Sequence, residues 1–360
     1  MLKQTWHKLS SRLIPQPLAV EDSEFLPELN LQQLISWQRY QSALGSHLKT
    51  PSRSSLAGQH RSRIQGRGME LSEIRNYQPG DDIRLMDWKV TARTRKPHTK
   101  VFLEEKERPV HLIVDMSNSM LFGSERSKAE QAANVAATLG WSCLSQGDRC
   151  GGLVFNGGNH QLIRPKARQK GLLPLLQTLC QYGKALDSDK KSMDSALRAD
   201  TGITGTIKNI KTGENIQTRK NIKTKENRET SAQPGRMNQV LQQMAAQPGH
   251  GNLMVLISDF WSLDLTDFSV LRQISKRHNL LAIQVSDPLE YELPDGPCYL
   301  TDGRQQIFFD GDKQQDQNRY RQGYDQRQQA LQQALLKTGG QLISLSTKEH
   351  PADVLKQYFA

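Results

Sequence analysis

The 360-residue sequence lacks any long apolar run, and this absence excludes one broad class of protein. A helix that crosses a bilayer needs about 20 consecutive, predominantly apolar residues, so we expect no membrane span. The segment from Met1 to Val20 is basic, but Pro15 and Pro17 interrupt its apolar positions, and no apolar stretch precedes a small-residue cleavage site. The sequence therefore predicts no secretory signal peptide.

Cysteine is scarce, and its spacing excludes two further classes of protein. The cysteines form no CxxC pair and have no histidine partners at zinc-binding spacing. We therefore expect neither a disulfide framework nor a structural zinc site, and the simplest prediction is a reduced, cytoplasmic protein. The residues concerned are Cys143, Cys150, Cys180 and Cys298.

Aromatic residues make up only 6% of the chain, which bears on the meaning of its net charge of +11. An excess of positive charge makes nucleic acid, anionic lipid and acidic proteins candidate partners. Proteins that bind single-stranded nucleic acid usually combine basic residues with aromatic side chains on which bases stack. The basic loop at residues 53–67 and the basic segment at 205–230 lack such aromatics, so we expect no nucleic-acid binding.

One short stretch joins a buried-strand pattern to a group of oxygen-bearing side chains. Residues 110–114 are mostly apolar and β-branched, which is typical of a strand covered on both faces. The strand is followed by Asp115, Ser117 and Ser119, whose alternate spacing allows their oxygens to converge on a hard cation such as Mg²⁺. Because Asp and Ser are also common in turns and helix caps, a simple capping turn is the alternative interpretation.

The rest of the chain predicts a parallel α/β sheet. An alanine-rich, periodic segment at 127–145 indicates a helix that packs closely on a sheet, and 150–155 indicates the next strand. A second very apolar strand at 252–259 ends in Asp259. Since ligand sites of parallel sheets lie beyond the carboxyl ends of the strands, we expect Asp115 and Asp259 at one edge. Further predicted strands are 100–107, 161–164, 279–285 and 341–345, with a hairpin at 297–309, and further predicted helices are 31–44, 172–179, 237–246, 264–277, 314–337 and 352–358.

Residues 183–235 interrupt this alternation. Threonine recurs every six residues from Thr206 to Thr230, which indicates a degenerate hexad repeat. The segment has too few isoleucines to fill a β-helix core, and its low hydrophobicity and mixed charge favour a disordered insertion. We therefore expect an N-terminal segment at 1–55, a subdomain at 56–108, an α/β domain at 109–350 interrupted at 183–235, and a C-terminal helix at 351–360.

Residues 66–93 are rich in glycine, charged residues and turn-forming residues. Pro79 and Gly80 suit the two central positions of a type II turn, and Asp81 or Asp82 can then cap a short helix that runs to about Trp88. The interleaved charges predict an ion-pair network that holds an N-terminal subdomain against the sheet, and a catalytic carboxylate pair is the alternative. The residues that mark this block are Arg75, Tyr77, Gly80, Asp81, Asp82, Arg84, Asp87, Trp88 and Arg93.

Two resemblances follow from these patterns. The Asp115-x-Ser117-x-Ser119 loop, together with Ser258-Asp259, resembles the metal-ion-dependent adhesion site of von Willebrand factor A domains. The block at 66–93, followed by Glu104-Glu105, Phe122-Gly123 and Gly147-Asp148-Arg149, closely resembles the bacterial family called domain of unknown function 58.

The resemblances imply a fold and a metal site. The fold is an α/β, von Willebrand factor A or Rossmann-like architecture, with a mainly parallel sheet, helices on both faces and a small preceding subdomain. The implied magnesium ligands are Asp115, Ser117, Ser119 and Asp259. The second loop of such sites normally supplies a threonine, and the corresponding stretch at 233–238 contains none.

The resemblance also implies a function. Members of that family are often encoded beside MoxR-type AAA+ ATPases, so we expect a non-enzymatic adaptor that couples such an ATPase to client proteins in chaperone-like assembly or maturation. A carboxylate of the partner would complete the magnesium shell. The alternative is a magnesium-dependent hydrolase or phosphatase with Asp115 as nucleophile, but the acid–base aspartate expected two residues later is replaced by Ser117.

Overall fold

The computed structural model describes residues 14–16, 29–41, 69–104, 108–201, 236–265, 267–292, 296–301 and 306–359. The chain forms two compact units. The larger unit comprises Met1–Ser52 and Pro109–Ala360, and the smaller unit comprises Arg53–Arg108. The basic loop at 53–67 and the residues at 202–235, which include most of the hexad repeat, lie outside the described residues.

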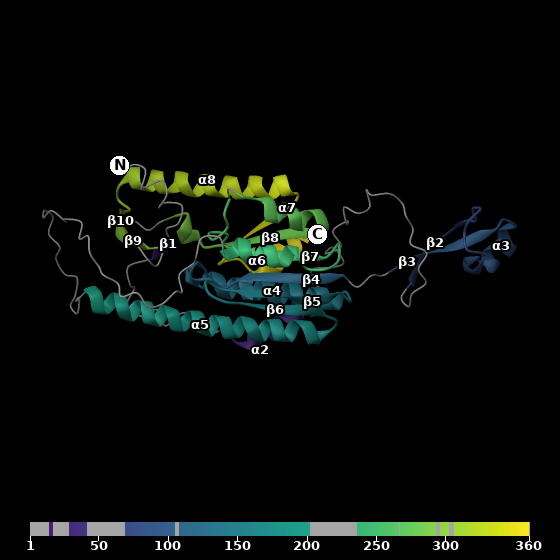
Figure 1. Ribbon diagram of the computed structural model, residues 1–360, viewed down its shortest axis with the longest axis horizontal. Helices are drawn as coiled ribbons and strands as arrows, with labels where there is room; N and C mark the ends of the chain where they lie inside the picture. Colours follow the sequence, from purple (N-terminus) through teal and green to yellow (C-terminus); the bar gives the residue numbers. More distant parts are fainter. Residues whose placement is uncertain are drawn as a thin grey trace. The chain divides into compact units, whose positions relative to one another are not determined.

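A six-stranded sheet forms the centre of the larger unit (Figure 1). Its strand order is β11-β8-β7-β4-β5-β6, and every neighbouring pair is parallel except β5 with β6. This arrangement confirms the predicted α/β class with a mainly parallel sheet. The strands are β4 (Pro109–Asp115), β5 (Arg149–Phe155), β6 (His160–Lys166), β7 (Leu253–Ser258), β8 (Asn279–Ser286) and β11 (Gln341–Ser346).

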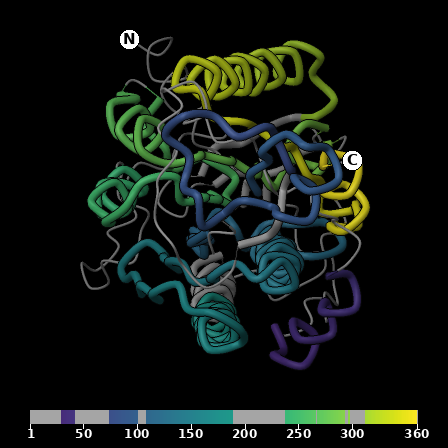
Figure 2. Tube along the Cα trace, turned by 90° about the vertical axis from the view of Figure 1, so that its right-hand side faces the viewer, coloured from purple at the N-terminus to yellow at the C-terminus, as the bar shows by residue number. Residues whose placement is uncertain are grey.

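Helices cover both faces of this sheet, as the apolar strands require (Figures 1 and 2). Val110, Leu112 and Val114 of β4 belong to the core on one face, whereas Ile113 belongs to the core on the other. This alternation follows from the two-residue period of a strand. One face is covered by α2 (Leu31–Ser36), α4 (Lys128–Ser145), α5 (Gln169–Thr201) and α9 (Pro351–Phe359), and the other by α6 (Arg236–Ala245), α7 (Ser269–Arg277) and α8 (Gln314–Thr338).

Small residues allow the helices of the first face to approach the sheet closely. The buried side of α4 is built from alanines, including Ala129, Ala133 and Ala136. At the start of α5, a Cβ atom on Gly171 would lie 1.8 Å from the backbone oxygen of Cys150 in β5. Only glycine fits at that contact, because protein interiors are close-packed and leave no space for a methyl group.

Several helices end at residues other than those predicted. Helix α2 stops at Ser36 and the chain continues as the 3₁₀ turn η1 (Trp37–Tyr40), so the predicted helix at 31–44 is too long. Helix α5 runs on to Thr201, well into the predicted insertion at 183–235. Helix α7 begins at Ser269 and not at 264, because the Asp267 carboxylate accepts a hydrogen bond from the Ser269 backbone N–H at 2.8 Å.

The predicted hairpin at 297–309 is confirmed. Strands β9 (Pro297–Thr301) and β10 (Gln306–Asp310) pair antiparallel, and β1 (Ile14–Gln16) adds a third strand on the other side of β9. No helix among the described residues is long and apolar enough to cross a membrane.

The smaller unit contains a two-stranded antiparallel sheet. Strand β2 (Met69–Asn76) pairs with β3 (His98–Glu104), with a bulge between Leu71 and Glu73. The strand predicted at 100–107 corresponds to β3, which pairs with β2 and is not part of the six-stranded sheet.

Two short helical segments follow β2, where the sequence predicted one. Asp82 caps the 3₁₀ turn η4 (Ile83–Leu85) by accepting from the Arg84 N–H at 3.0 Å. Asp87 caps helix α3 (Trp88–Thr94) by accepting from the Val90 N–H at 3.0 Å. Met86 lies between them in an extended conformation, with ψ of 130°, so one continuous helix cannot form.

The charged residues of the signature block stabilise turns within the smaller unit. The Arg75 guanidinium pairs with Asp81 at 2.8 Å, and the other oxygen of Asp81 accepts from the Gln78 N–H at 2.9 Å. Gly80 has φ of +102°, as the predicted turn requires. Of the remaining signature residues, Asp87 pairs with Lys100 at 3.7 Å, Tyr77 is half-buried, and Arg84, Trp88 and Arg93 are exposed.

Candidate functional site

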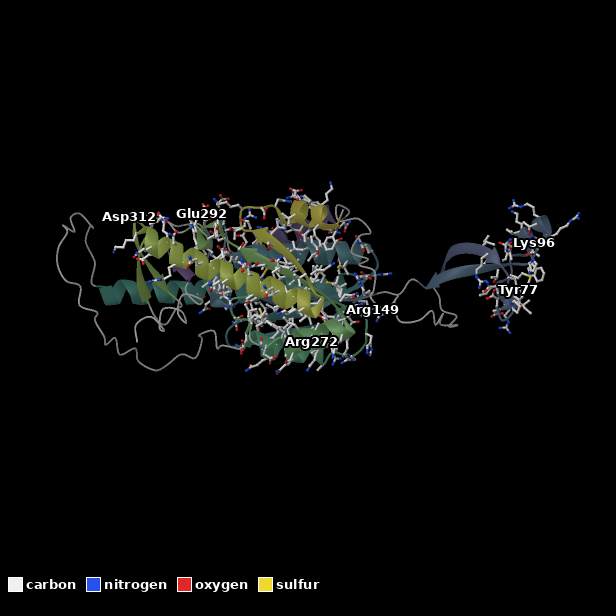
Figure 3. All side chains as sticks on the ribbon, turned by 90° about the horizontal axis from the view of Figure 1, so that it is seen from above. Tyr77, Lys96, Arg149, Arg272, Glu292 and Asp312 are labelled. Atoms are coloured by element: carbon white, nitrogen blue, oxygen red, sulfur yellow. The ribbon has the colours of Figure 1, made fainter. Side chains whose placement is uncertain are left out.

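The candidate site lies where the strand order of the central sheet reverses. Strand β4 is the first strand of the sheet along the chain, and its two neighbours, β5 and β7, lead towards opposite edges. In open α/β sheets, such a switch point separates the loops that follow the two strands, which leaves a place where ligands bind. Figure 3 shows Arg149, at the start of β5, and Glu292, beyond the end of β8, in opposite halves of the larger unit.

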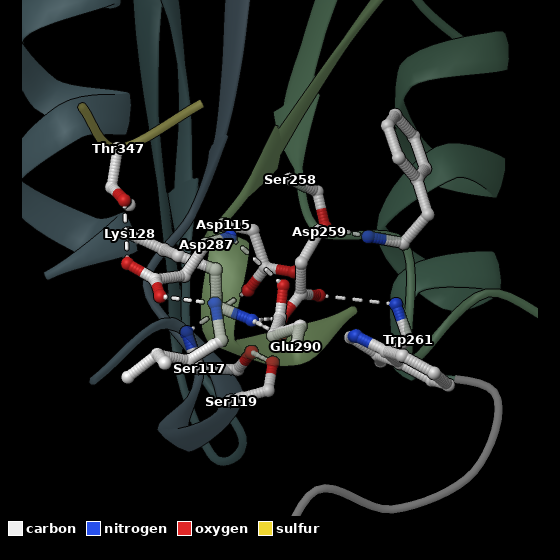
Figure 4. A network of polar contacts seen from close by, with 12 residues as sticks. Asp115, Ser117, Ser119, Lys128, Ser258, Asp259, Trp261, Asp287, Glu290 and Thr347 are labelled. Atoms are coloured by element: carbon white, nitrogen blue, oxygen red, sulfur yellow. Dashed lines mark hydrogen bonds and ion pairs between the residues drawn. The ribbon is translucent and has the colours of Figure 1, made fainter. Parts of the chain in front are cut away.

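The two predicted aspartates meet at this switch point (Figure 4). Asp115 is the last residue of β4, and Asp259 directly follows β7. The Ser258 hydroxyl donates to Asp115 Oδ2 at 2.6 Å and thereby joins the two strand ends. Both aspartates are buried, so the predicted proximity of the carboxylates holds, but they do not face open solvent.

The Asp115 loop is closed by its own hydrogen bonds. Asp115 Oδ1 accepts from the Ser117 backbone N–H at 2.9 Å, and the hydroxyl oxygens of Ser117 and Ser119 lie 3.2 Å apart. Ser117 is buried and Ser119 is half-buried. Asp115 therefore closes a turn that leads into the 3₁₀ turn η5 (Asn118–Leu121), but the side chain of Ser117, at the N-cap of η5, makes no capping hydrogen bond.

A lysine that the sequence pattern did not single out lies at the centre of the site. Lys128 is the first residue of α4, whose N-cap is Ser127. Its ammonium donates to Asp259 Oδ2 at 2.7 Å and to Glu290 Oε1. The three side chains are 0%, 1% and 2% exposed, which makes this a fully buried ion triad.

Glu290 comes from the end of a third strand. Strand β8 is followed by Asp287 and by the 3₁₀ turn η6 (Pro288–Glu290), which form a capping box. Asp287 Oδ1 accepts from the Leu289 N–H at 2.9 Å, and the Asp287 N–H donates to Glu290 Oε2 at 3.1 Å. Asp287 Oδ2 accepts from the Ser124 N–H at 2.8 Å and from the Thr347 hydroxyl at 2.5 Å.

We call these side chains the strand-end network. All eight oxygens of its four carboxylates accept a hydrogen bond from a protein donor. A buried carboxylate is costly unless its oxygens are paired, so this completeness accounts for the burial of so many acids. The network consists of Asp115, Ser117, Lys128, Ser258, Asp259, Asp287 and Glu290.

Electrostatics distinguish the members of the network. The pKa of Asp115 is raised to about 6, mainly by burial and also by the Asp259 carboxylate. The hydrogen bonds from Ser258 and Ser117 lower this pKa but do not offset the increase. Burial disfavours the charge on Lys128, but Asp259 and Glu290 together hold its pKa above the usual value. Burial also raises the pKa of Glu290, although Lys128 opposes that shift. The lysine is therefore the permanently charged centre of the network.

The residues present do not fit a resident magnesium ion. Both oxygens of Asp115 and both oxygens of Asp259 already accept from protein donors, and the donor to Asp259 Oδ2 is an ammonium group. A divalent ion beside that ammonium would be repelled by it. Across the described ranges, no group of three or more His, Cys, Asp or Glu side chains is placed to hold a metal. Magnesium at this edge stays a prediction, and the stretch expected to supply the threonine, 233–235, is outside the described residues.

An aromatic cluster borders the network. Trp261 and Tyr324 have ring centroids 6.3 Å apart, and Tyr291 and Tyr324 have centroids 5.5 Å apart. The Arg327 guanidinium lies 5.0 Å from the Trp261 ring centroid and donates to the backbone oxygens of Phe260 at 2.8 Å and Trp261 at 2.9 Å. These bonds hold the loop after β7, in which Phe260 adopts a positive φ of 61°. Because Tyr291 and Trp261 follow Glu290 and Asp259 within two residues, the cluster and the network share their loops.

Sequence reasoning missed Lys128, Asp287, Glu290 and the aromatic cluster. A lysine at the start of an alanine-rich, buried helix was one available signal. Asp287-Pro288-x-Glu290 after an apolar strand was another, because this spacing is typical of a capping box. Neither pattern indicates which charge it pairs with, since the partners lie far apart in the sequence.

The fold and this edge together define a Rossmann-like α/β protein with a buried ionic network at its switch point. A family model described as "Protein of unknown function DUF58" matches residues 73–334, and the chain belongs to this family, as its motifs predicted. It is 30% identical over 249 residues to the uncharacterized proteins Mb1516 of Mycobacterium bovis and Rv1480 of Mycobacterium tuberculosis. The match covers 69% of this chain and 64% of each of those proteins, so it spans less than two thirds of their length.

A shorter similarity extends to another organism. The uncharacterized protein YeaD of Bacillus subtilis is 32% identical over 98 residues, which cover 27% of this chain and 21% of that protein. No solved structure matches the chain.

Proposed function

We propose that this protein is a non-enzymatic adaptor that binds an AAA+ ATPase of the MoxR type and client proteins through the carboxyl edge of its central sheet. The observation that carries the proposal is the closed strand-end network. Its acids are buried and fully hydrogen-bonded to the protein itself. The acids therefore stabilise the conformation of the loops at this edge, and a partner binds the exposed surface of those loops.

The same observation disfavours the hydrolase alternative. A nucleophilic carboxylate must reach its substrate, but Asp115 is 0% exposed and both of its oxygens accept from neighbouring residues. A cavity of about 300 Å³ lies between α8 and β11. It is lined by residues such as Gln328 and Ser344, and none of its lining residues belongs to the strand-end network.

The aromatic cluster is the part of the edge best suited to contact a partner. Tyr, Trp and Arg are the residues that most often dominate the binding energy of protein interfaces. Tyr291 is 41% exposed, and the Arg321 guanidinium lies 5.8 Å from its ring centroid. Trp261 is half-buried beside it on the loop that carries Asp259.

The test is a binding measurement between the purified chain and the MoxR-type ATPase of the same organism. Tyr291→Ala removes an exposed ring from the cluster, and we expect binding about tenfold weaker, because losing an anchoring side chain costs over about 1 kcal/mol. Tyr358→Ala is the matched control, since Tyr358 is also 41% exposed but lies on α9 and not on the loops that follow β7 and β8. Equal binding by the wild type and both variants, in calorimetry, contradicts this docking edge.

A further inference from the structure

Acidic side chains lie together at the ends of three strands, and two of them contact one cation, Lys128, which the chain itself supplies. Strands β4, β7 and β8 are neighbours in the sheet, and Asp115, Asp259 and Glu290 lie at or shortly after their carboxyl ends. Like charges brought together in a buried site repel one another unless a counter-ion lies between them. Lys128 Nζ contacts both Asp259 and Glu290, and Ser258 links Asp259's strand to Asp115 (Figure 4).

We infer that the Lys128 ammonium takes the structural place of a metal ion, so that the carboxyl edge of this protein is assembled without a divalent cation. The ammonium is held by the covalent chain, and its presence does not depend on the metal concentration. This inference concerns how the edge is built, and it does not depend on which partner binds there.

The geometry around the ammonium supports this role. An ammonium group has three N–H donors. Two of them meet the carboxylates of Asp259 and Glu290, and the face of the Phe122 ring lies 6.0 Å from Nζ, at the limit of a cation–π contact. Nothing in this arrangement leaves a donor facing solvent, since the Lys128 side chain is 0% exposed.

The position of Lys128 in its helix explains how it reaches the centre. Ser127 caps α4 by accepting from the Glu130 N–H at 3.1 Å, which fixes the first turn of the helix beneath the strand ends. Lys128 is the first residue of the helix, and its long side chain places the ammonium group beside the carboxylates. The Lys128 N–H donates to the Phe122 backbone oxygen at 2.9 Å, so the loop after Asp115 and the helix are tied together.

One consequence concerns recognition at this edge. In the predicted adhesion-type mechanism, a partner's carboxylate binds the metal directly. A carboxylate of a partner cannot reach Lys128, because the ammonium is buried behind the acids that it neutralises. Contact with a partner must then be made by the exposed side chains of the loops.

The first test uses the wild-type chain. We expect its melting temperature to be the same in EDTA and in about 1 mM Mg²⁺ or Mn²⁺, a concentration that fills even weak protein sites for divalent ions. We also expect free Mn²⁺ to give an unaltered electron paramagnetic resonance spectrum in the presence of the protein. A melting temperature lowered by EDTA, or Mn²⁺ binding that Ser117→Ala abolishes, overturns the inference.

The second test replaces the lysine. Lys128→Ala removes the charge and leaves space among the carboxylates, whereas Lys128→Met removes the charge and fills the space with a stem of similar length. We expect Mg²⁺ or Mn²⁺ to raise the melting temperature of Lys128→Ala by several degrees and to leave that of Lys128→Met unchanged. If Lys128→Ala folds neither with nor without metal, the double variant Lys128→Ala/Glu290→Gln, which removes one charge of each sign, takes its place.

The two substitutions separate the possible outcomes. An increase in melting temperature with metal that is confined to the alanine variant supports the inference, because a divalent ion then neutralises the carboxylates in place of the ammonium. No gain in either the alanine variant or its Glu290→Gln companion overturns it, because the lysine then does not occupy a cation position. A metal-dependent gain in Lys128→Ala supports this inference whether or not the ATPase binds, so absence of ATPase binding counts against the proposed function alone.

Discussion

Lys128→Met is the substitution for which the structure predicts the largest loss of stability. The side chain fits the same space, but the charge that neutralises Asp259 and Glu290 is lost. These carboxylates are 1% and 2% exposed, so water cannot replace the ammonium. Removing one partner from a buried ion pair costs about 3–5 kcal/mol, since it leaves an uncompensated buried charge. That is a large share of the roughly 5–15 kcal/mol by which a folded domain is stable.

The assay is urea denaturation of the wild type, of each single variant and of the pair. Glu290→Gln removes the opposite charge from the same triad, and the double variant Lys128→Met/Glu290→Gln removes both. We expect the double variant to lose less stability than the sum of the single variants, by on the order of 1–3 kcal/mol, because the two groups interact directly. Strictly additive losses refute the claim that the ammonium and Glu290 form one unit.

The pH dependence gives a second readout for Lys128→Met. Without the ammonium, the pKa of Glu290, which burial already raises, rises further in the folded state. The folded variant then binds more protons than its unfolded chain, so its stability increases as the pH falls through that raised pKa. We therefore expect the deficit relative to the wild type to shrink on acidification. A deficit that grows on acidification contradicts this account.

Three further predictions concern single sites. Burial and Asp259 raise the pKa of Asp115 to about 6, so the wild type loses stability as the pH rises from the ordinary carboxyl range to that value. Asp115→Asn should lack this loss when the two proteins are compared by urea denaturation across the pH range. Burial and the nearby His278 lower the pKa of His111 to about 4, so this histidine costs the wild type up to about 3 kcal/mol as the pH falls from the ordinary histidine pKa to that value. His111→Leu should make the fall less steep without abolishing it, because burial also lowers the pKa of His278 to about 4, and an unchanged slope contradicts the assignment. Gly171→Ala places a methyl group 1.8 Å from a backbone oxygen of β5 and should cost about 1–3 kcal/mol by thermal denaturation, whereas Gly158→Ala, whose nearest neighbour lies at 4.0 Å, should be nearly neutral.

Local patterns were sufficient to predict most elements of the central sheet. The strand at 110–114 and the helix at 127–145 were expected within a few residues of their observed bounds, because a fully apolar strand and an alanine-rich helix each show their burial in the sequence itself. The hairpin at 297–309 was expected from its Asp-Gly turn and alternating flanks. Predictions failed where neighbouring backbone decided the conformation, as at Met86, which interrupts the helix predicted to run to Trp88.

The sequence by itself determined that Asp115 and Asp259 would meet. Each follows a buried strand, and the carboxyl ends of parallel strands share one edge of the sheet. The apolar pattern of the two strands and the parallel sheet that it indicates were therefore enough to predict that the two aspartates lie close together. What those carboxylates bind was decided only by the tertiary structure. Lys128 is 131 residues from Asp259 and 162 residues from Glu290, and no local pattern relates charges over such distances. The folded packing brings the lysine against Asp259, one of the residues that the motif predicted as metal ligands, and against Glu290, which the motif did not indicate.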